Sequence, residues 1–180
     1  MQEKFSGSVT LGYAALFLLL WLSHLPYVNW YPNESFTAAI PLVMIFSVTI
    51  AIAGIFCFFY DAKTDAVLFL FLGAAGFSGA LRFVIYPNLA ANTAPSMVDG
   101  WSSFFTGVVI LYLWLASMKT NPFKQFFLLS LWLALFAMAI TNWFSSMIFA
   151  YIGGYLGLLA AVLAGLYSAS TVLPSKQSAA

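Results

Sequence analysis

Ionisable side chains are scarce in this chain, so the few that occur limit the chemistry that it can perform. Among 180 residues there are 6 Lys or Arg, 5 Asp or Glu and 1 His. Arg82 is the only arginine and precedes Tyr86 and Pro87 at the expected end of an apolar segment. An ionisable residue inside a membrane span indicates a functional site, whereas an arginine near a helix end can extend its guanidinium to the interface. Arg82 could therefore attract anions at the outer mouth of a path or anchor a helix end.

Thr141 and Asn142 form a second candidate site, at the end of another apolar segment. The amide of Asn142 can hydrogen-bond a carboxylate or a urea-like solute, and it can equally cap the turn that follows. His24 stands near the outer end of the first apolar segment, either as an interfacial hydrogen-bonding residue or as a sensor of pH. We take Arg82, Thr141 and Asn142 as candidate residues of a substrate path.

The groups that catalysis requires are missing from the apolar segments. No Asp or Glu is expected deep in any of them, and no nucleophile stands beside a candidate base. Cys57 is the only cysteine, which excludes an intrachain disulfide and a multi-cysteine metal site. The net charge of +1 offers no basic patch for phosphates. We therefore expect a protein that is not an enzyme, with no metal, no cofactor and no nucleic-acid partner.

The segments that must position these residues are long and apolar. The chain is 63% hydrophobic and 6% charged. A bilayer core requires about 20 apolar residues per helix, and a backbone in lipid must satisfy its own hydrogen bonds, which favours helices. The sequence predicts an all-α polytopic membrane protein with a single domain over residues 1–180. The six expected transmembrane helices lie near residues 8–28, 37–60, 66–86, 100–118, 122–143 and 148–170.

The lysines predict the orientation of these helices. They fall on the two tails and on the second and fourth turns: Lys4, Lys63, Lys119, Lys124 and Lys176. With six crossings all of them lie on one side, and the positive-inside rule then places both termini in the cytoplasm. We expect a multi-pass protein of the cell membrane, in a bacterial or archaeal inner membrane, with the lipid bilayer as a partner.

Small residues recur at helical spacing in two of the expected helices. Gly153, Gly157, Ala161 and Gly165 follow one another at four-residue intervals, and Gly76 belongs to a similar group. This spacing puts small residues on one face and lets helix backbones approach closely. The faces could pack helices within one chain, join subunits or line a narrow pore. We expect that some of this surface serves an oligomer.

Four short motifs resemble those of the succinate–acetate permease family, also called acetate uptake transporters. Where the family has Pro-Leu-Gly-Leu, Ala-Gly, Phe-Ala-Leu-Leu-Ala-Ile-Gly-Asn and Gly-Trp-Ile-Gly, this chain has Thr10-Leu11-Gly12-Tyr13, Ala53-Gly54, residues 135–142 and Gly154-Tyr155-Leu156-Gly157. The motifs share their order and spacing with the family over most of the chain. The resemblance implies a six-helix protomer, a homohexameric ring and one substrate path through each protomer.

The resemblance also implies an apolar constriction made by a Phe, a Tyr and a Leu. These fall on Phe17 (or Leu16, one register away), Leu72 and Leu131 of this chain. Leu72 thus replaces a tyrosine, and Cys57 replaces a carboxylate that the family usually has after its Ala-Gly. The departures bear on the substrate and on coupling to protons.

Three functions remain open from the sequence. The first is a channel or permease for small monocarboxylates such as acetate, with succinate as a further substrate. The second is a channel for small neutral solutes such as urea or short amides, which the loss of a tyrosine hydroxyl at Leu72 favours. The third is a structural or accessory membrane subunit, which is compatible with the expected lack of buried charge.

Overall fold

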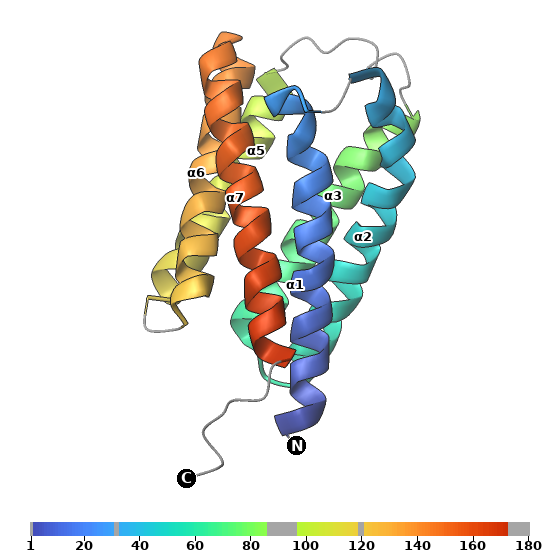
Figure 1. The fold of residues 1–180 in the computed structure, drawn as a ribbon, viewed down its shortest axis with the longest axis vertical. Coiled ribbons are helices and arrows are strands. Elements are labelled where there is room, and N and C mark those ends of the chain that lie inside the picture. Colours follow the sequence, from blue (N-terminus) through green and yellow to red (C-terminus); the bar gives the residue numbers. More distant parts are fainter. Residues whose placement is uncertain (1, 31–32, 86–96, 119–120, 173–180) are drawn as a thin grey trace.

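The computed structural model describes residues 2–30, 33–85, 97–118 and 121–172, which are almost entirely helical (Figure 1). The long helices are α1 (Gln2–His24), α2 (Asn33–Phe59), α3 (Lys63–Ile85), α5 (Met97–Ala116), α6 (Pro122–Phe144) and α7 (Met147–Val172). A short 3-10 helix, η1 (Leu25–Val28), follows α1. Within the described residues, 6 helices are long and apolar enough to cross a membrane, which confirms the predicted all-α fold.

Two helix boundaries near prolines differ from the predicted ones. α1 ends at His24 rather than at Val28, because Pro26 lacks the N–H that would continue the α-helix, and the chain goes on as η1. α2 begins at Asn33, earlier than predicted, so Pro41 lies inside the helix and not in its first turns. The helix α2 therefore contains a proline in its interior, which cannot donate a backbone hydrogen bond.

The beginning of α6 is set by a local capping pattern, at the residue where the sequence predicts it. The Asn121 side chain accepts a hydrogen bond of 2.9 Å from the backbone N–H of Phe123, and Pro122 takes the first helical position. Two other helices begin a few residues earlier than predicted, α3 at Lys63 and α5 at Met97. Their first turns therefore contain residues that the sequence placed in loops.

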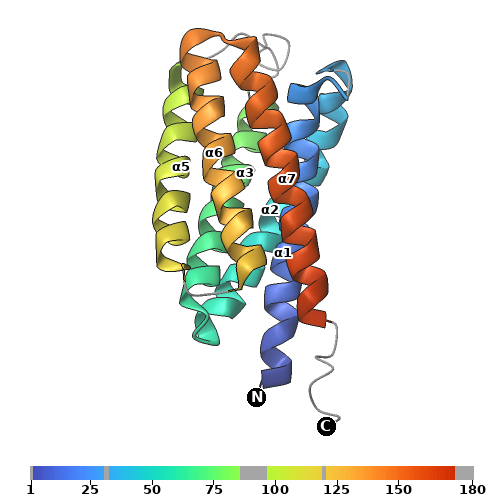
Figure 2. The same cartoon turned by 60° about the vertical axis from the view of Figure 1, so that its left-hand side comes forward.

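The six long helices form a ring in which each helix packs against its neighbours in chain order. α2 packs against α1 and α3, α6 packs against α5 and α7, and α7 packs against α1. The ring closes through a smaller contact between α3 and α5 (Figures 1 and 2). The two halves of the chain are therefore joined broadly at α1/α7 and narrowly at α3/α5.

Apolar side chains occupy both the centre and the outside of this ring. The largest fully buried ones come from five of the six helices and include Tyr13, Leu16, Ile50, Phe69, Ile110, Phe127 and Leu131. Many other large apolar side chains are exposed, among them Phe59, Tyr112 and Phe126. An exterior of this kind would aggregate in water and suits contact with lipid.

The candidate packing glycines all lie at contacts between helices of one chain. Gly76 faces Ser47 of α2, Gly153 faces Met138 of α6, Gly157 faces His24 of α1, and Gly165 faces Phe17 of α1. A side chain at Gly157 would collide with the imidazole of His24, which is itself buried. The close approach of α1 and α7 therefore depends on the lack of a side chain at residue 157.

The first residues of α1 and the last residues of α7 lie at the same side of the bundle, which we call the terminal end (Figure 1). The turn between α2 and α3 lies at this end too, because α1 leads away from it and α2 leads back. Four residues used in the predictions lie outside the described residues: Tyr86, Pro87, Lys119 and Lys176.

Candidate functional site

Three helices that take alternate places in the ring bring side chains to its central axis. These are α1, α3 and α6, and all three run away from the terminal end. Because they are parallel, side chains that face inward at matching heights on them can meet at the axis. The resulting layers along the axis are the candidate solute path.

The middle of these layers is aromatic. Tyr13 of α1 lies edge-on to Phe69 of α3, with ring centroids 4.9 Å apart, and to Phe127 of α6, at 5.7 Å. Such edge-to-face contacts are favourable because the positive ring edge meets the negative ring face. Tyr167 of α7 packs on Tyr13 in the same way, at 4.6 Å. We call Tyr13, Phe69 and Phe127 the aromatic layer; all three side chains are fully buried.

A leucine layer follows one helical turn further from the terminal end. It consists of Leu16, Leu72 and Leu131, which come three or four residues after the members of the aromatic layer. An α-helix has about 3.6 residues per turn, so the three leucines share one depth. Their exposed fractions are 0%, 7% and 0%, and all belong to the same buried cluster. Hydrocarbon therefore fills the axis at this level.

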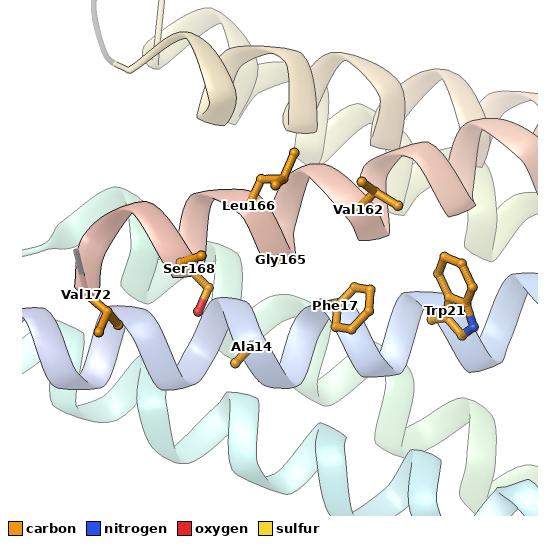
Figure 3. Close-up of a pocket in the computed structure, with 9 residues that line it drawn as sticks. Ala14, Phe17, Trp21, Val162, Gly165, Leu166, Ser168 and Val172 are labelled. Atoms are coloured by element: carbon orange, nitrogen blue, oxygen red, sulfur yellow. The ribbon is translucent and has the colours of Figure 1, made fainter.

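Phe17 does not take part in this layer, although the sequence pointed to it first. It lines an apolar groove of about 570 Å³ between α1 and α7, together with Trp21 and Gly165 (Figure 3). Leu16 occupies the inward position instead. The sequence allowed both registers, and the contact of Phe17 with Gly165 decides between them, because it turns the ring towards α7 and away from the axis.

An ionic layer lies on the other side of the aromatic layer, next to the terminal end. The Lys124 Nζ of α6 donates a hydrogen bond of 2.6 Å to Asp65 Oδ1 of α3. The Tyr13 hydroxyl donates to the same oxygen at 2.8 Å. Lys124 is 5% and Asp65 is 9% exposed. We call Asp65 and Lys124 the ionic layer.

This buried pair contradicts two expectations from the sequence. The helix predicted from residue 66 leaves Asp65 in the preceding turn, and the prediction of orientation counts Lys124 among the lysines of the turns. The structure places both in first helical turns, because α3 begins at Lys63 and α6 at Pro122. The cap at Asn121 is the feature of the sequence that could have indicated this position, because it places Lys124 inside the helix. The direction of the Lys124 side chain then depends on the face of the helix on which it lies.

Arg82 pairs with Asp99 across the narrow contact between α3 and α5. Both guanidinium nitrogens donate to the carboxylate, with Nη2 at 3.0 Å from Oδ2. The two side chains are 35% and 36% exposed. Asp99 lies in the first turn of α5 and offsets the charge of Arg82. The role of Arg82 in a substrate path stays a prediction.

Thr141 and Asn142 both hydrogen-bond to their own helix. Thr141 Oγ1 donates to the carbonyl of Ala137 at 2.9 Å, and Asn142 Nδ2 donates to the carbonyl of Met138 at 3.0 Å. The Asn142 amide group therefore uses a donor locally, in α6. A contact of either residue with a solute stays a prediction.

Comparisons with known proteins agree with this architecture at the level of the fold. The sequence matches no protein-family model and no curated protein. A solved structure, that of the bacterial acetate channel SatP, superposes with a TM-score of 0.81. The match covers 93% of this chain and 97% of that chain, at 18% sequence identity. The chain is thus an integral membrane protein that shares the six-helix fold of a bacterial acetate channel.

Proposed function

We propose that this chain is a channel for small monocarboxylates such as acetate, with one pore along the axis of each protomer. The observation that carries the proposal is the layered axis of a helix ring whose fold matches an acetate channel over 93% of the chain. Its layers come from three alternate helices, so a small shift of these helices changes the width of the path at one depth. The proposal includes no catalytic activity.

The leucine layer acts as the size filter in this proposal. An ion that crosses hydrocarbon must lose its hydration shell, which is costly without compensating polar groups. Apolar constrictions in channels therefore control passage by size and by dewetting. Acetate carries one carboxylate on one methyl group, whereas succinate carries two carboxylates and a longer chain. We therefore place acetate before succinate as the permeant.

Small neutral solutes such as urea are the second candidate. The leucine layer itself favours them, because Leu16, Leu72 and Leu131 offer no hydroxyl or charge to a carboxylate. A neutral solute loses less hydration energy at this level than an anion does. The two candidates differ in what they need from the polar groups on either side of the leucines.

Flux measurements on purified protein in liposomes test both candidates. Labelled acetate and labelled urea are supplied separately to proteoliposomes and to protein-free liposomes. We expect acetate flux well above the protein-free rate, with a smaller excess for urea. Urea flux without acetate flux would favour the neutral-solute channel. Protein-free rates for both solutes would contradict a transport function and favour an accessory subunit.

A further inference from the structure

We propose that Lys124 is a binding site for the carboxylate of the permeating monocarboxylate, and that Asp65 occupies this site when no solute is present. The inference rests on the proposed function and names the group that recognises the solute. Asp65 and Lys124 lie at the terminal end of the axis, one layer before the aromatic side chains. A solute that enters from this end meets the ionic layer before it meets the leucines.

A buried ion pair is by itself weak evidence for a role in stability. Removing two charges from water costs more than their attraction returns in many proteins, and well-packed apolar side chains are often as good. Lys124 also lies in the first turn of α6, where the helix dipole disfavours a cation. A chain with only 6% charged residues nevertheless keeps a lysine and an aspartate at its axis.

The same turn region holds an ordinary ion pair for comparison. Lys63 Nζ lies 3.1 Å from Asp61 Oδ1, and the two side chains are 77% and 82% exposed. Such exposed pairs contribute little because water and salt screen them. The Asp61–Lys63 pair thus shares residue types and location with the ionic layer but lies outside the axis, which makes it a matched control.

The geometry at Asp65 resembles that of a bound carboxylate solute. Two donors from different helices, Lys124 Nζ and the Tyr13 hydroxyl, converge on the single oxygen Oδ1. A lysine ammonium has three N–H donors, and Asp65 is its acceptor among the described residues. An acetate ion presents the same carboxylate group and can therefore replace Asp65 at both donors.

The surroundings of this site also fit the rest of an acetate ion. Phe69 and Phe127 pack on the ring of Tyr13 and come one helical turn after Asp65 and Lys124, further from the terminal end. With its carboxylate on Lys124, the ion would direct its methyl group towards these rings, which are apolar. Asp65 itself stands in the first turn of α3, at the terminal end of the bundle. Exchange of one carboxylate for another would thus open the ionic layer.

The test compares four forms of the protein in proteoliposomes: wild type, Lys124→Met, Asp65→Asn and the double variant. The half-saturating acetate concentration and the flux of urea are measured for each. We expect Lys124→Met to raise the half-saturating concentration by about tenfold or more, the range for loss of a hydrogen bond to a charged group. Asp65→Asn should lower it, because the internal competitor loses its charge. Urea flux should change much less in both variants.

The exposed pair supplies the controls. Lys63→Met and Asp61→Asn should leave the half-saturating acetate concentration near that of the wild type. Because Lys124→Met leaves Asp65 buried without its partner, the protein could fail to fold, so the double variant is the second test. It carries no buried charge, and it should elute as wild type in size-exclusion chromatography while still showing the raised half-saturating concentration.

Two results would overturn the site. One is an equal change of acetate and urea flux in Lys124→Met and in the double variant, which would mean that the ion pair blocks the path without recognising a carboxylate. The other is an unchanged half-saturating acetate concentration in the double variant.

Binding of ¹³C-acetate to detergent-solubilised protein, followed by NMR, separates this site from the proposed function. Acetate binding that depends on Lys124, in a wild-type protein without acetate flux, would support the site and contradict the channel. Acetate flux in the wild type, with acetate binding that does not change when Lys124 is replaced, would support the channel and contradict the site.

Discussion

At the scale of single residues, we propose that the leucine layer determines which solutes pass. Leu131 lies fully buried at the axis, whereas Leu133 of the same helix is exposed. We expect Leu131→Ala to raise the flux of solutes larger than acetate and to cost about 2–5 kcal/mol of stability, as for other buried leucines. Flux of acetate, propionate and butyrate in proteoliposomes measures the effect. Leu133→Ala is the matched control, and an equal change in that variant would contradict the axial position of Leu131.

The register of α1 makes a second prediction at the same scale. Leu16 is buried at the axis, while Phe17 lines the groove against α7. Leu16→Ala should therefore change the ratio of propionate to acetate flux, and Phe17→Ala should leave that ratio unchanged. If Phe17→Ala alone changed it, the inward position would belong to Phe17.

At the scale of helices, the contact between α1 and α7 depends on Gly157. A methyl group there would overlap the buried imidazole of His24. We expect Gly157→Ala to destabilise the protomer by about 1–3 kcal/mol, the usual range for overpacking, measured as a lower thermal midpoint in detergent. Gly79→Ala is the control, because an added Cβ at Gly79 meets no atom within 4 Å. Additional replacement of His24 by Ala should restore part of the loss; no restoration would exclude this overlap as the cause.

The pair of Arg82 and Asp99 belongs to the narrow contact between α3 and α5. Because the pair is partly exposed, we expect Arg82→Gln to cost no more than about 1 kcal/mol of stability. If Arg82 attracts anions, this variant lowers acetate flux more than urea flux, and Asp99→Asn does the opposite by removing the compensating charge. Both differences should decrease as salt is added, since salt screens exposed charges. Equal effects on both solutes would indicate that the pair is a structural tie.

At the scale of the whole molecule, we propose a homohexamer with its termini in the cytoplasm. The apolar exterior leaves wide surfaces of each protomer for lipid or for neighbouring protomers, including the groove beside Phe17. Native mass spectrometry from mild detergent should give the mass of six chains. A monomer under the same conditions would contradict the hexamer and leave the axial pore of one protomer unaffected.

The sequence by itself determined that this protein lies in a lipid bilayer and that it has six spanning helices. A hydrophobic content of 63% with 6% charge permits few alternatives to spanning helices, because lipid leaves no partner for an open backbone. The start of α6 was also legible, since Asn121 and Pro122 act locally. Leu72 and Leu131 were selected through the family resemblance, and their place at the axis follows from the ring.

Only the tertiary structure decided which side chains face the axis. Residues 14–21 of α1 are all apolar, so the pattern along this helix does not distinguish Leu16 from Phe17. The sequence did not predict the ionic layer, for a related reason. Asp65 and Lys124 are 59 residues apart in the chain, and each of them alone resembles a residue of a turn. Their attraction, and that of Tyr13 to the same carboxylate, exists only after the ring of helices has closed around them.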